Sequence, residues 1–188
     1  GMIARATGTA SPLGRMLDGL CDHGVFAVIY ISLGLAVNTT EGWVLMWAAG
    51  IAHAVQSNLF EAERTRFHRR AKGDPGEVAP VRTRMPLERL YDGVTAVFDR
   101  AAARFDRALA VAPDSRALGQ AYAARAVPAM RLLSLESANM RVLAIFLACA
   151  VGDPRLFWWF ELGPLTVIAI IGMLLHRRAE RALIQEQS

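Results

Sequence analysis

The amino-acid sequence predicts an all-α, polytopic membrane helix bundle, a single membrane domain with four transmembrane helices and additional cytoplasmic amphipathic helices. Hydrophobic residues make up 54% of the chain although 20% of its residues are charged, and the mean hydropathy is +0.28. The charges are segregated along the sequence. Between His23 and Phe60 the one formally charged residue is Glu41, and residues 163–174 carry no charge. Apolar runs bounded by charged flanks are typical of membrane proteins.

The composition also excludes several classes of protein. A hydrophobic content of this size argues against a disordered or collagen-like chain. The 21 basic residues only slightly outnumber the 17 acidic ones, which argues against a nucleic-acid binder that works through a basic stripe. Cys21 and Cys149 lack the CxxC spacing, so we expect two separate thiols rather than a disulfide or a zinc site.

The first predicted pair of membrane helices occupies residues 24–38 and 43–58. A helical pattern begins near Leu13 and ends at the polar residues 38–42, which are a turn signal. A helix from Asp18 to Asn38 is about 30 Å long at 1.5 Å per residue, enough to cross a bilayer. The second run begins with aromatic residues suited to a membrane interface and ends in an arginine-rich flank.

Residues 73–130 are predicted to form a cytoplasmic loop, because the chain turns polar there and glycine and proline residues interrupt it. Within this loop an amphipathic helix is expected at residues 87–111, with apolar residues that include Phe98, Phe105 and Leu109 on one stripe. Packing of this stripe against neighbouring protein is the simpler interpretation. The alternative is that the helix lies flat on the membrane surface.

The second pair of membrane helices is predicted at residues 132–151 and 157–175, with a tight turn at residues 152–155. The last span has 19 residues, about 28 Å of helix. Arginine-rich segments follow the second and fourth spans. The positive-inside rule therefore places residues 1–23, the long loop and the C-terminus in the cytoplasm.

Gly14, Asp18 and Asp22 recur at intervals of four, so they share one face of the first helix where it enters the membrane. Two carboxylates one turn apart repel each other, and burying both without a partner is costly. Oxygen ligands of this kind suit a hard cation such as Mg²⁺ (or Mn²⁺), which leaves room for substrate phosphates. Carboxylates solvated at a helix end are the simpler alternative.

The surrounding sequence resembles the signature of the CDP-alcohol phosphatidyltransferases, D-x2-D-G-x2-A-R-x8-G-x3-D-x3-D. The match begins at the first glycine of the signature and comprises Gly1, Ala4, Arg5, Gly14, Asp18 and Asp22. A chance match from Ala-Arg to the last Asp has odds of about one in ten thousand for such a chain. The family has a six-helix fold, so the resemblance implies that this chain contains helices three to six and that the first two aspartates lie upstream of Gly1.

The resemblance implies transfer of a phosphatidyl group from a CDP-activated donor, expected to be CDP-diacylglycerol, to an alcohol hydroxyl with release of CMP. Residues that match the first half of the signature are implied to bind the substrate nucleotide: Gly1, Ala4, Arg5 and Gly14. The glycines allow close approach to the backbone, and Arg5 offers a fork of donors to a pyrophosphate. Asp18 is implied to ligate the metal, and Asp22 to act both as a ligand and as the catalytic base.

The resemblance also sets the expected location and partners. We expect a phospholipid-synthesising enzyme of the bacterial inner membrane, with its active site facing the cytoplasm. The partners implied are the CDP-activated lipid, the alcohol, membrane lipid and a second copy of the chain in a homodimer. We expect no nucleic-acid partner.

Polar residues near the membrane boundary are weaker candidates for contacts to the acceptor or to a phosphate: Arg64, Ser134, Ser137 and Arg141. His53, Gln56 and Ser57 form a similar stripe on the second span. Polar side chains at membrane depth seldom face lipid, so hydrogen bonds between helices are the simpler interpretation. For Arg64 the simpler interpretation is that it belongs to a basic flank, which sets the topology and attracts anionic headgroups.

Two other functions stay open from the sequence alone. A membrane prenyltransferase also holds Mg²⁺-pyrophosphate with paired aspartates, but such enzymes usually need a second acidic motif. Asp92, Asp99 and Asp106 recur every seven residues in a helix expected outside the membrane, which favours a solvated edge. A truncated, non-catalytic membrane protein is the other alternative, because the first two aspartates of the signature do not precede Gly1 here.

Overall fold

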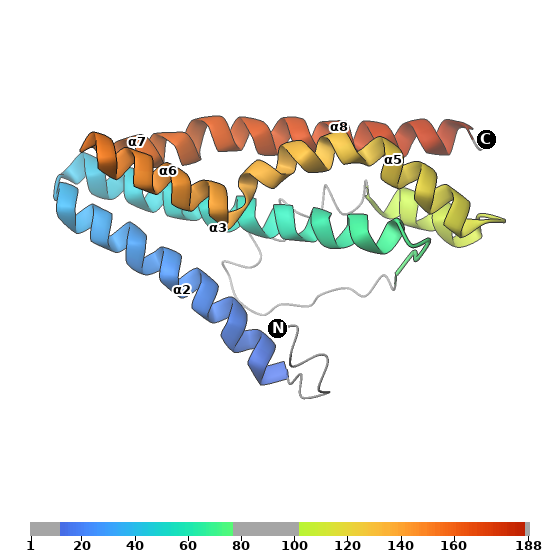
Figure 1. Cartoon of the computed structure of the whole chain (residues 1–188), viewed down its shortest axis with the longest axis horizontal. Coiled ribbons are helices and arrows are strands. Elements are labelled where there is room, and N and C mark those ends of the chain that lie inside the picture. The colour runs from blue at the N-terminus through green and yellow to red at the C-terminus, as the bar shows by residue number, and fades with distance from the viewer. Residues whose placement is uncertain (1–11, 77–101, 187–188) are drawn as a thin grey trace.

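The computed structural model describes residues 12–76 and 102–186, and for residues 12–23 it describes the backbone alone. This part of the chain is helical and contains no strand, which confirms the predicted all-α class. Figure 1 shows an elongated bundle with the C-terminus at one end. At the other end lies the turn between α2 (Pro12–Val37) and α3 (Thr40–Arg70).

The predicted polar turn joins α2 and α3 into an antiparallel hairpin. Asn38 has a φ of 43°, a left-handed conformation that asparagine tolerates better than most residues. The Thr39 hydroxyl caps α3 by accepting a hydrogen bond from the Gly42 N–H at 3.0 Å. Helix α3 then extends to Arg70, well beyond the apolar run at residues 43–58.

A second helical region begins within the segment predicted to be a loop. Residues 102–111 are helical, and α5 (Ser115–Leu133) follows after a short turn. The Asp114 carboxylate caps α5 by accepting a hydrogen bond from the Ala117 N–H at 2.9 Å. The segment predicted to be a loop at residues 73–130 therefore contains most of a 19-residue helix.

The described part of the amphipathic helix packs on protein. Phe105 and Leu109 are buried in a cluster with Tyr122 of α5, as the simpler interpretation predicts. Residues 87–101 of the predicted helix lie outside the described residues. Gly119 permits a close approach nearby, because a Cβ atom there would lie 2.3 Å from the Arg70 carbonyl oxygen.

The third predicted span is bent. The short 3-10 turn η1 (Ser134–Glu136) and the extended residue Ser137 separate α5 from α6 (Ala138–Val151), and the two helices form an angle of 43°. Because η1 contacts α3, the bend brings polar residues of the chain to the side of that helix.

The last helical stretch is continuous from Arg155 to Glu186. It follows Gly152, whose φ of 85° makes it a left-handed cap for α6, so the predicted turn at residues 152–155 is present. The stretch comprises α7 (Arg155–Phe160), the widened π turn η2 (Glu161–Leu165) and α8 (Thr166–Glu186). Pro164 lies in the π turn, where its missing N–H is accommodated.

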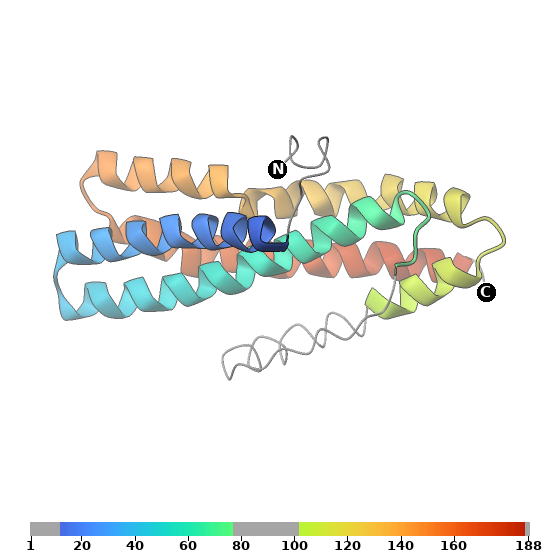
Figure 2. The same cartoon turned by 90° about the horizontal axis from the view of Figure 1, so that it is seen from below.

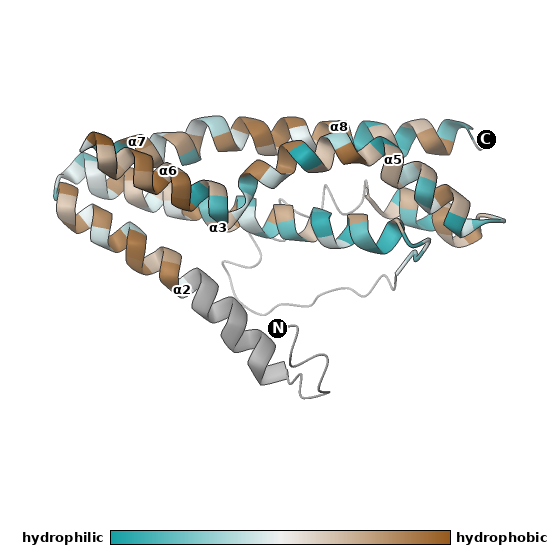
Figure 3. Ribbon diagram, in the orientation of Figure 1, coloured by the Kyte–Doolittle hydropathy of each residue, from teal (hydrophilic) through white to brown (hydrophobic). Residues whose placement is uncertain are grey.

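The bundle has two chemically different halves, which Figure 3 shows as a brown end and a teal end. We define the apolar half as residues 24–58 and 134–175, and the polar half as residues 59–70, 102–133 and 176–186. Among the described side chains, every exposed large hydrophobic residue except Val111 lies in the apolar half. Exposed apolar surface of this extent normally faces lipid or another protein.

One helix of the described chain, Arg155–Glu186, is long and apolar enough to cross a membrane. The bent pair Ser115–Glu136 and Ala138–Val151 passes the same test if it is counted as one span, whereas Gly24–Val37 is apolar but shorter. The described residues thus provide one or two membrane-compatible helices. The four-span topology stays a prediction.

Helix α3 connects the two halves. Figure 2 shows it crossing the bundle from beside α2 at one end toward α5 at the other, and it contacts both helices as well as α8. In the apolar half the core forms around Met46, Ala49 and Trp158. In the polar half it forms around Phe105 and Tyr122.

Candidate functional site

A polar cleft of about 680 Å³ lies between α2, α3 and the bend from η1 to α6. It lies where the two halves meet, because its lining includes Arg64 of the polar half and Arg141 of the apolar half. Its polar and charged lining residues include His53, Ser57, Arg64, Glu136, Ser137 and Arg141. The chain thus gathers at one place polar residues that are up to 88 positions apart in sequence.

Arg141 forms the buried centre of this cleft wall. Its Nε donates to Glu161 Oε1 at 2.9 Å, and its Nη2 donates to Glu136 Oε2 at 2.8 Å and to Gln56 Oε1 at 3.0 Å. Its Nη1 donates to the Glu136 carbonyl oxygen. The guanidinium therefore joins α3, η1, α6 and η2 through bonds that its planar geometry favours.

Gln56 connects this cluster to the π turn. Its Nε2 donates to the Glu161 carbonyl oxygen at 3.1 Å and to Thr166 Oγ1 at 3.0 Å. The widened turn leaves a carbonyl available to a side chain of another helix, as is common where π turns interrupt α-helices. The position of Glu161 is therefore fixed through both its backbone and its carboxylate.

The buried cluster carries more acid than base. Glu136 and Glu161 are both buried, with Arg141 between them as the buried arginine. His53 Nδ1 lies 3.5 Å from Glu161 Oε1. Among the described residues no hydrogen-bond donor meets Glu136 Oε1. Unpaired buried carboxylate oxygens are costly, so a ligand with donor groups would stabilise this oxygen.

The mouth of the cleft holds a second ion pair. Arg64 Nη1 lies 3.2 Å from Glu61 Oε2, and the two side chains are 54% and 61% exposed. An exposed pair of this kind contributes little to stability. Glu61 does, however, neutralise the charge of Arg64, which with Arg141 is one of the two arginines that line the cleft in the described chain.

The structure brings together three of the four weaker candidates. Arg64, Ser137 and Arg141 line the cleft. Ser134 is exposed, and its hydroxyl donates to the Arg131 carbonyl oxygen at 2.7 Å, so it is a surface residue of η1. Two residues of the polar stripe on the second predicted span, His53 and Ser57, also line the cleft. The third, Gln56, accepts a hydrogen bond from Arg141.

The signature residues fall at the edge of the described chain. Gly14, Asp18 and Asp22 lie within α2, but their side chains lie outside the described residues. Gly1, Ala4 and Arg5 lie outside the described residues altogether. Among the side chains that are described, no group of three or more His, Cys, Asp or Glu residues could hold a metal ion.

The sequence alone did not predict two acidic residues of the cluster. Glu161 lies within the apolar span predicted at residues 157–175, and Glu136 lies near the start of the span predicted at residues 132–151. The position of Glu161 was itself a signal, because a carboxylate within an apolar helix usually has a function or a partner.

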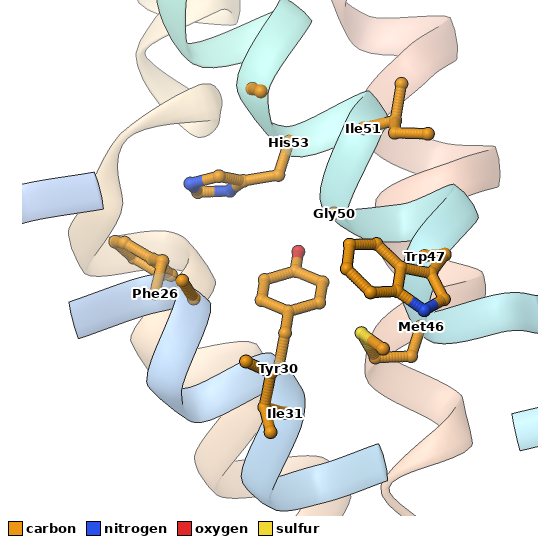
Figure 4. A pocket seen from close by; sticks show the side chains of 10 residues that line it. Phe26, Tyr30, Ile31, Met46, Trp47, Gly50, Ile51 and His53 are labelled. Atoms are coloured by element: carbon orange, nitrogen blue, oxygen red, sulfur yellow. The ribbon is translucent and has the colours of Figure 1, made fainter. Parts of the chain in front are cut away.

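A smaller apolar pocket of about 300 Å³ adjoins the cleft between α2 and α3 (Figure 4). Phe26 and His53 line both spaces, and their ring centroids lie 4.4 Å apart. Figure 4 shows the Tyr30 hydroxyl directed toward the His53 ring, with Trp47 on the other side of the pocket. An apolar and a polar compartment thus share one wall.

The polar half contains a separate buried network. Glu63 Oε2 lies 2.6 Å from His176 Nδ1, and the Tyr122 hydroxyl lies 2.5 Å from His176 Nε2. Arg177 and Arg66 also pair with Glu63. Burial by itself would raise the pKa of Glu63, but the hydrogen bond from His176 and the charge of Arg177 lower it to about 2.

The same network holds the end of α3. Arg70 is fully buried, and its Nε lies 2.7 Å from Asp106 Oδ1 while its Nη1 lies 2.5 Å from Glu180 Oε1. Partial burial would raise the pKa of Asp106, but the hydrogen bond and charge of Arg70 lower it. Since bases match or outnumber acids here, the network is explained by helix packing.

No protein-family model, curated protein or solved structure matches this chain. The case for a function therefore depends on the residues themselves.

Proposed function

We propose that the protein is a CDP-alcohol phosphatidyltransferase that uses a divalent cation to transfer a phosphatidyl group from CDP-diacylglycerol to an alcohol. The observation that carries the proposal is the spacing of six residues from Gly1 to Asp22, which agrees with the family signature at each position present. Release of CMP makes the reaction a displacement at phosphorus, which requires positioning and charge stabilisation more than a covalent intermediate.

The roles follow the chemistry of each side chain. Arg5 would hold the pyrophosphate of the donor, and the backbone at Gly1, Ala4 and Gly14 would face the nucleotide. The alcohol oxygen attacks the lipid-linked phosphorus, the bond from that phosphorus to the CMP oxygen breaks, and the hydroxyl proton passes to the Asp22 carboxylate.

The donor set fits a hard cation. Asp18 and Asp22 offer carboxylate oxygens alone, the ligand type that Mg²⁺ or Mn²⁺ prefers, and they lie one turn apart on a single helix. A bound cation would neutralise charge on the phosphate oxygens. The chain itself would supply the two ligands, the arginine and the base.

The cleft supports this proposal because α2 leads into it. The interval of four that relates Asp18 to Asp22 continues to Phe26, whose side chain lines both the polar cleft and the apolar pocket. Residues four apart share a helix face. An acceptor bound in the cleft would therefore be close to the helix that carries the acidic pair.

The apolar half supports a membrane setting. Its exposed surface is hydrophobic while its interior holds the Arg141 cluster, the reverse of the pattern in a water-soluble domain. We propose four spans in the bacterial inner membrane, with the acidic pair at the cytoplasmic face, in a homodimer. A lipid donor would then present its phosphate at the interface, next to a soluble alcohol.

The proposal is tested by measuring CMP release from CDP-diacylglycerol by the full-length protein in lipid vesicles supplied with Mg²⁺ and a mixture of alcohols. Asp22→Asn removes the base and is expected to lower the rate at least about a hundredfold. Asp18→Asn should also lower it, by weakening metal binding. Asp153→Asn is the matched control, because Asp153 is exposed in the turn before α7 and pairs with Arg155.

The control variant should keep the wild-type rate. Equal rates for Asp22→Asn and Asp153→Asn would contradict the assignment of the base. Pyrophosphate release from a prenyl diphosphate, without CMP release from any CDP-lipid, would instead identify a prenyltransferase.

A further inference from the structure

We propose that the acceptor is an amino alcohol without a phosphate, bound in the polar cleft with its ammonium group at Glu136. This inference rests on the proposed function, which it narrows to one class of acceptor. It follows from the charges, hydrogen bonds and burial of the described residues that line the cleft.

A phosphate on the acceptor finds no unpaired arginine or lysine among the described residues that line the cleft. Phosphate recognition relies on arginine or lysine side chains whose donors are free to form charge-assisted hydrogen bonds. Two arginines line the described cleft. Arg141 directs its donors to Glu161, Glu136 and Gln56, and Arg64 pairs with Glu61.

An ammonium group finds a matching acceptor. Glu136 is 1% exposed and lines the cleft, and its Oε1 has no hydrogen-bond partner among the described residues. Its Oε2 is already bonded to Arg141. An ammonium carries three donors and one positive charge, so it would satisfy this oxygen and balance the second buried carboxylate of the cluster.

His53 does not replace the ligand in this role. The one ion pair that it forms in the described chain is with Glu161, at 3.5 Å, so a protonated His53 would leave Glu136 Oε1 unsatisfied. The hydroxyl end of the acceptor has neutral neighbours in Ser57, Asn58 and Asn139, which also line the cleft. These side chains can orient an alcohol without repelling a nearby phosphate donor.

The first experiment compares acceptors by CMP release with CDP-diacylglycerol and Mg²⁺ in vesicles. The probes are ethanolamine, 3-aminopropan-1-ol, glycerol and sn-glycerol 3-phosphate, each at the same concentration. The amino alcohols are expected to be used with kcat/KM at least about tenfold above the other two, which is the discrimination expected from one charge-assisted hydrogen bond.

The outcomes separate the inference from the function on which it rests. CMP release that is fastest with glycerol or with sn-glycerol 3-phosphate would overturn the inference and leave the transferase assignment standing. Absence of CMP release with every acceptor would overturn the transferase assignment, and the inference with it.

The second experiment uses Glu136→Gln, which keeps an oxygen acceptor for Arg141 and removes one of two buried negative charges. The ratio of kcat/KM for ethanolamine to that for glycerol is measured, because this ratio does not depend on how much protein is folded. We expect the ratio to fall about tenfold. Glu41→Gln, an exposed substitution at the start of α3, should leave it unchanged, and an unchanged ratio in Glu136→Gln would overturn the inference.

Discussion

Both halves of the bundle bury charged side chains, but the balance of charge differs between them. In the apolar half Arg141 faces two buried carboxylates, those of Glu136 and Glu161. In the polar half Glu63 alone meets two arginines and a histidine. The first cluster borders a cleft, whereas the second lies among packed helices.

This difference separates a structural network from a candidate binding site. A buried network in which bases match or outnumber acids can be explained by the packing of its helices. A buried excess of acid at the wall of an open cleft is stabilised when a cationic or hydrogen-bonding ligand arrives. Helix packing therefore accounts for the polar-half network, and ligand binding is the role proposed for the cleft beside Arg141.

The largest expected effect follows from removing the single buried cation of the apolar half. Arg141→Met keeps most of the side-chain volume but leaves Glu136 and Glu161 without their partner. We expect a loss of about 3–5 kcal/mol of unfolding free energy, measured by thermal unfolding in detergent. Arg155→Met is the matched control, because its pair with Asp153 is exposed and should contribute about 1 kcal/mol or less.

Equal melting temperatures for the two arginine variants would show that the Arg141 cluster is not a stabilising centre. The buried charges of the apolar half would then make no measurable contribution to the free energy of unfolding.

In the polar half, Glu63→Gln is expected to have the next largest effect. A pKa lowered from 4.5 to about 2 corresponds to about 3 kcal/mol of stabilisation. Because the pKa is lower in the folded state, this stabilisation is complete above pH 4.5 and is lost as the pH falls toward 2. Wild-type stability should therefore decline across this interval, and the variant should decline less.

Urea unfolding at a series of pH values measures this dependence. Glu61→Gln is the control on the same helix, since Glu61 is 61% exposed and should change stability by about 1 kcal/mol or less. Parallel pH profiles for the wild type and Glu63→Gln would refute the assignment of a stabilising role to Glu63.

The smallest expected effect compares two glycines. At Gly119 in the polar half a Cβ atom would lie 2.3 Å from the Arg70 carbonyl oxygen, whereas at Gly24 in the apolar half nothing lies within 4 Å. Gly119→Ala should lower the unfolding free energy by about 1–3 kcal/mol through overpacking. Gly24→Ala should raise it by up to about 1 kcal/mol, because alanine favours the helix. Effects of the same sign would contradict the packing described between α5 and α3.

The sequence predicted the helical class and both tight turns, because the residues that form turns do so locally. Asn38 adopts the left-handed conformation and Gly152 ends α6 in it. The extension of α3 to Arg70 was not foreseen, because hydropathy marks where an apolar run ends and not where a helix ends. Charged residues such as Glu63 continue the helix because partners on α8 bind them.

The candidate site was only partly predictable for a similar reason. Arg141 and Ser137 could be named from their polarity in an apolar context. Glu161 could not be paired with Arg141 from spacing, because the two residues lie on different helices and meet through the turn at residues 152–155. The bend at Ser137, which brings η1 to α3, has no glycine or proline to mark it.

The central claim is that this chain carries the acidic pair of a metal-dependent CDP-lipid transferase. The most direct measurement is CMP release from CDP-diacylglycerol by the wild-type full-length protein in vesicles, with Mg²⁺ present and after its removal by EDTA. We predict CMP formation that depends on both an alcohol and Mg²⁺, that stops after chelation and that returns when Mg²⁺ is restored. No CMP formation with any CDP-lipid, or formation at the same rate after chelation, would contradict the claim.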